Sequence, residues 1–114
     1  MQTRFFPQRE MIFTNHPKFE NVKAAMFITG EESSTACVCM IEIAPGSEIP
    51  IHTHETETDS IFVVQGGGEA YVNGTWRTIE AGDYLYIPAK GEHGTRNTGA
   101  VPLRLFVHRS ALLA

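Results

Sequence analysis

Apolar side chains recur along this chain in short alternating or continuous runs, and no segment shows the 3.6-residue period of an amphipathic helix. Each run has the length of a β-strand, and glycine, proline, asparagine or aspartate separates it from the next. The pattern predicts strands at roughly residues 10–14, 22–29, 35–43, 48–54, 58–65, 68–72, 75–79, 83–87, 92–97 and 102–109.

Turn residues mark the ends of several of these strands. Asn73-Gly74 is typical of a two-residue type I′ hairpin turn, because that turn needs a positive φ at both central positions. Pro45-Gly46 ends the strand before it. Many short strands with regular turns predict an all-β sandwich or barrel, and closure into a jelly-roll barrel removes the unpaired edges of a sheet.

The length of 114 residues predicts one domain. The chain contains no linker, low-complexity tract or internal repeat. Residues 1–20 contain four phenylalanines among polar residues, so we expect an N-terminal arm or strand there, followed by a β-barrel over residues 21–114. The arm has two possible partners, the chain's own barrel and a neighbouring subunit.

The charge pattern excludes one class of partner. The formal net charge is −4 and the lysines and arginines are scattered, which argues against a nucleic-acid surface. No apolar stretch is long enough to span a bilayer, and the first residues lack a signal-peptide pattern. We therefore expect no membrane partner and a cytoplasmic location.

The two cysteines, Cys37 and Cys39, lie in one apolar run. At positions i and i+2 of a strand they share a face, which is a poor geometry for a mutual disulfide. No further cysteine or histidine lies near them at the spacing of a structural zinc site. We expect both to be small apolar residues of the core.

Three of the five histidines fall into two clusters with the spacing of metal ligands. His52 and His54 lie two residues apart, so on an extended strand both side chains project from one face. Asp59 follows them, and His93 lies in the second cluster. Imidazole and carboxylate groups suit Fe, Mn, Ni, Zn or Cu. The pattern predicts a site for one divalent transition metal ion.

These two segments resemble the paired sequence motifs of the cupin superfamily, whose members are small β-barrels of jelly-roll type, also called double-stranded β-helices. The resemblance covers residues 35–109, and the positions in register are Gly46, His52, His54, Asp59 and Gly66 in the first motif and Gly82, Pro88, His93 and Asn97 in the second. Two positions depart from the motifs. Asp59 stands where the family usually has glutamate, and the inner glycine of the second motif is displaced by one residue to Gly91.

The resemblance implies that His52, His54, Asp59 and His93 are the metal ligands. Asp59 is one methylene shorter than glutamate, so its carboxylate falls about 1.5 Å short unless the strand or the metal shifts. Glu57 has the same strand parity and a longer reach. We expect Asp59 to be the ligand and Glu57 a catalytic general base. Ligation by Glu57 and a site of three histidines alone are the open alternatives.

Two further side chains are candidates for substrate binding. Arg96 follows His93 on the same predicted strand and could bind an anionic group, and Tyr86 alternates with apolar residues on a neighbouring strand. His16, which precedes a proline, is interpreted as a loop residue, and His108 is given no role.

A metal ion with open coordination positions can chelate a substrate or act as a Lewis acid. The resemblance therefore implies a metal-dependent enzyme acting on a small polar metabolite, as an oxygenase (dioxygenase-like), isomerase, decarboxylase or lyase. The alternative is a non-catalytic module that binds or senses a small molecule. A metal-independent, sugar-modifying barrel fits the complete ligand set less well. The resemblance also implies a homodimer, while the substrate, the reaction and the metal stay open.

Overall fold

The protein is described by a computed structural model over residues 2–111, so the last three residues of the expected barrel segment lie outside the described residues. A short 3-10 helix, η1 (Gln8–Glu10), precedes the first strand. The strands are β1 (Thr14–Asn15), β2 (Val22–Ile28), β3 (Ala36–Ile43), β4 (Glu48–His52), β5 (Glu57–Gln65), β6 (Gly67–Val72), β7 (Thr75–Glu80), β8 (Tyr84–Ile87), β9 (His93–Arg96) and β10 (Leu103–Ala111).

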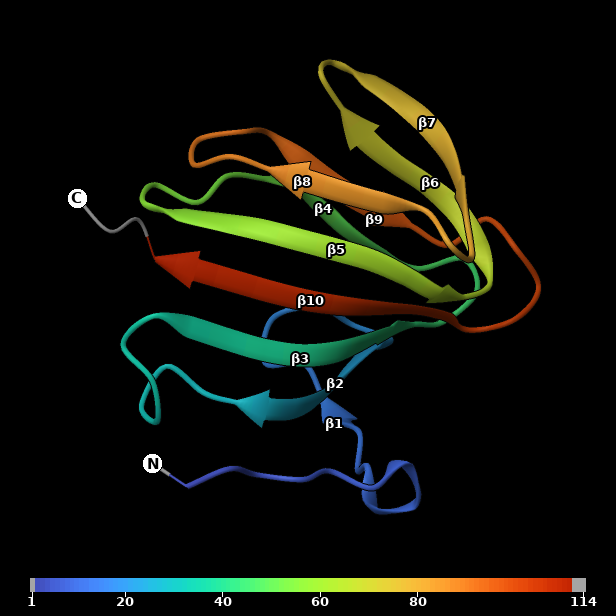
Figure 1. The fold of residues 1–114 in the computed structure, drawn as a ribbon. Helices are drawn as coiled ribbons and strands as arrows, with labels where there is room; N and C mark the ends of the chain where they lie inside the picture. The colour runs from blue at the N-terminus through green and yellow to red at the C-terminus, as the bar shows by residue number, and fades with distance from the viewer. Residues whose placement is uncertain (1, 112–114) are drawn as a thin grey trace.

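The strands form two antiparallel sheets, which confirms the all-β jelly-roll expectation (Figure 1). The larger sheet has the order β1-β2-β3-β10-β5-β8, and the smaller one has the order β4-β9-β6-β7. In Figure 1, β3, β10 and β5 run side by side across the front of the molecule. The chain crosses repeatedly between the sheets, so segments distant in sequence meet in the interior.

Strand alternation builds the core between the two sheets. In β10, Leu103, Leu105 and Val107 are buried, while the residues between them lie on the outer face. Ile61 and Val63 of the neighbouring β5 extend the same inner layer. Burial of each such side chain contributes about 1.5–3 kcal/mol. This apolar layer supports the end of the barrel where the polar site lies.

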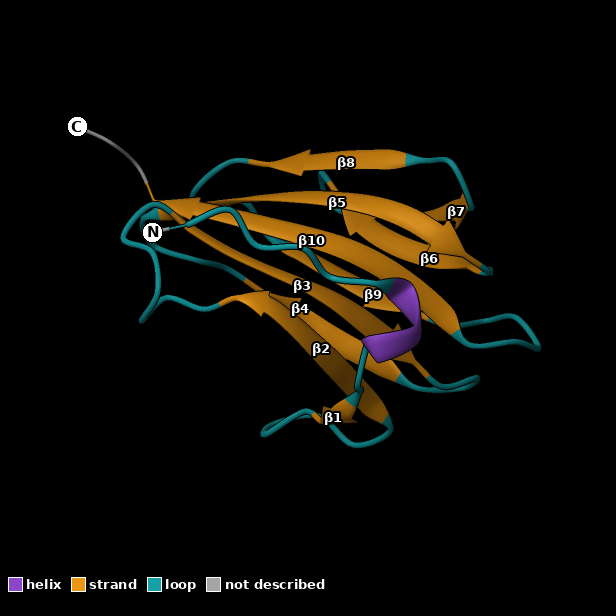
Figure 2. Ribbon diagram, turned by 60° about the horizontal axis from the view of Figure 1, so that its bottom comes forward, coloured by secondary structure: helices purple, strands orange, loops and turns teal. Residues whose placement is uncertain are grey.

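The predicted strands from residue 22 onward each overlap an observed strand. The predicted strand at 10–14 is wrong for most of its length, since η1 ends at Glu10 and β1 begins only at Thr14. The segment pairs with β2 of the same chain through two residues, and the Phe6 ring packs edge-to-face on Phe27 with centroids 5.2 Å apart. Figure 2 shows this segment crossing the six-stranded sheet. The arm therefore packs on its own barrel.

Several turn residues and motif residues have a structural role. The Asn73-Gly74 hairpin turn is confirmed by positive φ angles of 50° and 83°. Gly66 has φ 81°, and a Cβ there would lie 2.9 Å from the Pro102 carbonyl oxygen. The buried Asn97 amide donates to the carbonyl oxygens of Ile43 and Val101 and accepts from the Gly99 N–H, at 2.8–2.9 Å. These contacts hold the segment between β9 and β10 against the barrel.

Cys37 and Cys39 are free thiols on the inner side of β3. Cys39 packs against the core, and burial raises the pKa of its thiol to about 11. The thiol is therefore protonated at neutral pH, as expected of a packing residue. Within residues 2–111, no helix has the length and apolar character needed to cross a membrane.

Candidate metal centre

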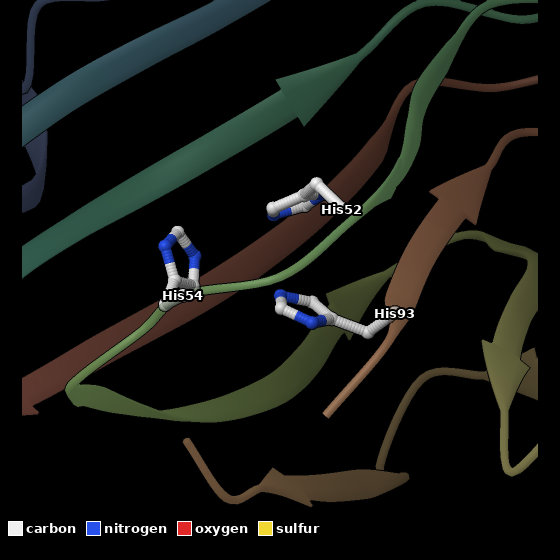
Figure 3. A group of neighbouring side chains, drawn as sticks. All are labelled: His52, His54 and His93. Atoms are coloured by element: carbon white, nitrogen blue, oxygen red, sulfur yellow. The ribbon is translucent and has the colours of Figure 1, made fainter. Parts of the chain in front are cut away.

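Three imidazole rings gather between the two sheets. His52, the last residue of β4, pairs directly with His93, the first residue of β9, and His54 follows in the loop to β5. The ring centroids of His52 and His93 are 4.2 Å apart. The ring centroid of His54 lies 5.0 Å from that of His52 and 5.4 Å from that of His93. Figure 3 shows the three rings around a common space. One ligating nitrogen from each ring lies within 4.8 Å of the others.

Backbone carbonyl groups orient two of these rings. The Nδ1–H of His52 donates to the Pro50 carbonyl oxygen at 2.8 Å, and that of His93 donates to the Gly91 carbonyl oxygen at 2.9 Å. A carbonyl oxygen only accepts, so the Nδ1 atom carries the proton in both rings. The Nε2 atom is then the one that faces a metal ion, an arrangement that holds a ligating histidine in one tautomer and one orientation.

Asp59 lies beside the histidines on the inner face of β5 and is only 2% exposed. Its Oδ2 atom lies 3.1 Å from His93 Nε2 and 3.2 Å from His54 Nε2. Two ligands in adjacent positions of an octahedral ion, each about 2.1 Å from it, are about 3 Å apart. The shorter side chain of aspartate therefore does not keep this carboxylate away from the histidines.

The unmet hydrogen-bonding capacity of His54 tests whether these residues fit a metal ion. Its Nε2 atom is buried and has no hydrogen-bond partner among the described residues, because the nearby Asp59 oxygen lacks the alignment of a hydrogen bond. An unpaired buried polar atom costs about 1–3 kcal/mol. Coordination of a divalent transition metal ion satisfies such a nitrogen, so the donor set fits that group.

The electrostatics of the site favour the metal-binding protonation states of His52, His54 and Asp59, whereas His93 has to release a proton before its Nε2 atom binds an ion. Burial lowers the pKa of His52 and of His54. Burial also acts to lower the pKa of His93, but its hydrogen bonds to Asp59 and to the Gly91 carbonyl raise that pKa overall. For Asp59, burial acts to raise the pKa, but the hydrogen bond from His93 and the charge of Arg109 lower it overall. The carboxylate is thus charged, and His52 and His54 are neutral at neutral pH.

The group borders a small cavity of about 80 Å³ inside the barrel. Its polar wall includes side chains from both sheets and from the loop after β1, and the apolar wall comes from the core strands. The lining residues are His16, Phe19, Cys39, Ile41, Ile49, His52, Asp59, Ile61, His93, Thr95, Leu105, Val107 and Arg109. The cavity gives a bound metal ion room for a ligand of limited size.

The other predicted site residues lie in different surroundings. Glu57 is half-buried at the start of β5, two residues before Asp59 on the same face. Arg96 pairs with Glu69 at 2.8 Å and stacks on Trp76, three positions after His93 and therefore on the opposite face of β9. Tyr86 is 59% exposed on the outer side of β8. The placement of Arg96 and Tyr86 does not support substrate binding beside the histidines, so that role stays a prediction.

Two polar residues at the cavity, Arg109 and His16, have no site role predicted from the sequence. Arg109 continues the inner row of β10, and its Nε–H donates to Asp59 Oδ1 at 3.2 Å. The sequence contains a signal for this placement. Arg109 is an even number of residues after the buried Leu103, so strand alternation places both side chains on the inner face of β10. His16 lies in the loop after β1, and its ring lines the cavity. No local pattern indicates that contact, because it depends on how the arm folds back.

Comparisons with known proteins agree with this fold. The oxalate-binding protein of Thermotoga maritima is 32% identical over 63 residues, which cover 55% of this chain and 52% of that protein. The 5-nitrosalicylic acid 1,2-dioxygenase of Bradyrhizobium is 35% identical over 79 residues, 68% of this chain and 37% of that protein. The chain spans about half the length of the first curated relatives it matches.

A solved structure shows the same fold. The crystal structure of a predicted oxalate decarboxylase from Thermotoga maritima superposes with a TM-score of 0.86 at 22% identity, covering 96% of this chain and all of that one. The family model described as the cupin domain matches residues 39–109, which is more than half of the chain and includes both histidine clusters. The chain therefore belongs to the cupin family.

Proposed function

We propose that this chain binds one divalent transition metal ion through His52, His54 and His93, and that the ion binds a small oxygen-rich metabolite. The observation that carries the proposal is the convergence of three imidazoles, one of which has a buried nitrogen without a hydrogen-bond partner. When bound, the ion supplies Lewis-acid polarisation of the substrate oxygens. Fe, Mn, Ni, Zn and Cu all suit these ligands.

We propose an enzymatic role, in which the side chains around the ion position the metabolite and move a proton. Asp59 is held by Arg109 and is the fourth ligand in this proposal. Glu57 lies on the same strand face and is the general base or acid, because its carboxylate is outside that hydrogen bond. The buried core below the cavity excludes bulk water from one side. The relatives include proteins named as a dioxygenase and as a lyase, which supports an enzyme without selecting the reaction.

The test combines metal analysis with a substrate panel. Protein purified and reconstituted in turn with Fe(II), Mn(II), Ni(II), Zn(II) and Cu(II) is expected to hold about one ion per chain by elemental analysis. Each loaded form is then incubated with small diketones, enols and hydroxy acids, and product formation and oxygen consumption are followed. Wild-type protein that retains no ion after dialysis contradicts the proposed function.

The second candidate function is a non-catalytic binding module. The observation that favours it is the relative named as an oxalate-binding protein, together with the small size of the cavity. Saturable binding of a panel compound by the loaded protein, with no turnover under any metal, supports this function. Turnover of any panel compound at a rate that depends on the bound ion supports the enzyme.

We further propose that the protein is a homodimer that pairs through the outer face of the six-stranded sheet. The exposed side chains of Phe62, Val64, Tyr84 and Tyr86 form an apolar patch on β5 and β8. Exposed apolar patches mark interaction surfaces. The proposed occupant of the patch is a second copy of the chain. Two-fold pairing places the patch of one copy against the same patch of the other. The patch is uncharged, whereas the net charge of −4 makes the rest of the two surfaces repel each other.

Light scattering during size exclusion is expected to give the mass of two chains. Phe62→Glu places a charge in the patch and is expected to give the mass of one chain. Thr78→Glu adds the same charge on β7, at an exposed position of the smaller sheet, and is the matched control. A monomeric wild-type mass, or equal masses for the two variants, contradicts this interface.

A further inference from the structure

The cavity has a cationic side that the three histidines do not provide. Arg109 lines it from β10, opposite the short strands β4 and β9 that carry His52 and His93. Its side chain is about one-third exposed, so it lines the cavity and also lies partly at the protein surface. Arg104 lies on the same strand but on the outer face, where it pairs with Glu42. Arg109 is thus an arginine turned into the barrel.

The hydrogen bonds of Arg109 leave most of its donors unused. A guanidinium group has five N–H donors in a planar fork. In the described part of the chain, the Nε–H donates to Asp59 Oδ1, and the terminal nitrogens have no hydrogen bond to a protein acceptor. Such a fork matches the two oxygens of a carboxylate. A residue that served only to neutralise Asp59 would need none of these donors.

His16 adds a second donor on the same side. The backbone N–H of Lys18 donates to His16 Nδ1 at 3.0 Å, and the ring stacks on Phe19 with centroids 4.7 Å apart. Because Nδ1 accepts, the proton of the neutral ring is on Nε2. The same ring lines the cavity with Arg109. A hydrogen-bond donor held by stacking and by a backbone contact therefore accompanies the guanidinium.

With a divalent ion bound, the charges of the site favour binding of an anion. A divalent ion and Arg109 are positive, Asp59 is negative, and the coordinating histidines are neutral, so the site keeps two positive charges. The carboxylate of Glu57, on the same strand face, leaves one of these uncompensated. A buried uncompensated charge is costly. A dicarboxylate balances the two positive charges that remain from the ion, Arg109 and Asp59, and a monocarboxylate balances the one that remains when Glu57 is included. Either acid also supplies oxygen ligands.

We propose that Arg109, assisted by His16, is a carboxylate-binding subsite beside the metal centre, and that the metabolite is a small carboxylic acid. This inference rests on the proposed function, since the other end of the ligand coordinates the ion. The size of the cavity limits the acid. One water molecule needs about 10–15 Å³ on the same measure, so about 80 Å³ holds a ligand of roughly five to eight non-hydrogen atoms.

The test compares two ligands of equal size and different charge. Oxalate carries two carboxylates, and oxamide is its neutral diamide. Both are titrated calorimetrically into Mn(II)-loaded protein whose metal content has been measured. Arg109→Met is expected to weaken oxalate binding by between about tenfold and 150-fold, because a hydrogen bond to a charged group contributes about 1.5–3 kcal/mol. Oxamide binding is expected to change less than about threefold.

Matched variants separate binding from structure. Arg104→Met removes the same charge from the outer face of β10 and is expected to leave oxalate affinity unchanged. Arg109→Lys keeps the charge without the planar fork and is the second variant if Arg109→Met is unstable, with a smaller loss of oxalate affinity expected. His16→Phe keeps the stacking on Phe19 and removes the donor, and is expected to weaken oxalate binding by about two- to tenfold.

The outcomes are distinct. Loss of oxalate affinity in the Arg109 variants, each loaded to the same measured Mn(II) content as wild type and each with unchanged oxamide affinity, supports the subsite. Equal loss for both ligands, or wild-type oxalate affinity in Arg109→Met, overturns it. Wild-type protein that holds no Mn(II) or other ion contradicts the proposed function instead. In that case the metal-free protein is titrated with oxalate. Oxalate binding that is lost in Arg109→Met still supports the subsite, and no oxalate binding by the metal-free wild type overturns it.

Discussion

Replacing both His52 and His54 by alanine is expected to lower metal affinity at least about 1000-fold. Zinc sites with four protein ligands contribute about 10–16 kcal/mol in total, so each ligand contributes about 3 kcal/mol and the loss of two exceeds the 4 kcal/mol that corresponds to this factor. His93 and a carboxylate would be the only protein ligands left. The affinity is measured by competition with a chelating dye, and the bound ion by elemental analysis after dialysis.

His108→Ala is the matched control for this double variant. His108 lies on the outer face of β10, where its Nδ1 atom is 3.2 Å from the Ser110 hydroxyl oxygen, and it is remote from the three-histidine group. Its removal is expected to leave the metal content at the wild-type level. Circular dichroism checks that both variants fold. A double variant that folds and retains as much metal as wild type shows that the ligand assignment is wrong.

The sequence predicted most of the barrel because the signals for it are local. Alternation with period 2 located the strands from residue 22 onward, and the Asn73-Gly74 turn fixed one hairpin register. The N-terminal arm was harder to predict from the sequence, because β1 pairs through two residues and the packing of the arm depends on aromatic contacts between distant positions. Local pattern carries no information on such contacts.

The site residues divide in the same way, into those that local spacing predicts and those that depend on which strands become neighbours. His52 and His54 share a face because of their spacing, and the family motif brought His93 to them from a distant strand. Arg109 joins the site because β10 pairs with β5, in a register that sets it opposite Asp59. A sequence pattern gives the face of each strand but not which strands become neighbours. Arg96 illustrates the same limit, since a residue three positions after His93 on one strand lies on the opposite face, and its role in substrate binding stays a prediction.

Asp59 connects the metal centre to the cationic side of the cavity. One carboxylate oxygen accepts from Arg109, and the other lies between His54 and His93. The Arg109 contact limits the rotation of the carboxylate, which holds the second oxygen toward the histidines. A glutamate here would place its carboxylate about 1.5 Å farther from the strand and could not keep both contacts without a backbone shift. Aspartate at this position and an inward arginine on β10 are therefore parts of one arrangement.

Asp59→Asn is accordingly expected to lower metal affinity about 100-fold, and Glu57→Gln less than about threefold. Both substitutions keep the side-chain shape and remove one negative charge, so each is the control for the other. Loss of an anionic ligand at the ion costs about as much as loss of an imidazole. Asp59 lies within 3.2 Å of two histidine nitrogens, whereas Glu57 forms no ion pair with a histidine in the described part of the chain. The measurement is dye competition with the same metal ion at one pH. A larger loss for Glu57→Gln would make Glu57 the ligand, and equal small losses would leave a centre of three histidines alone.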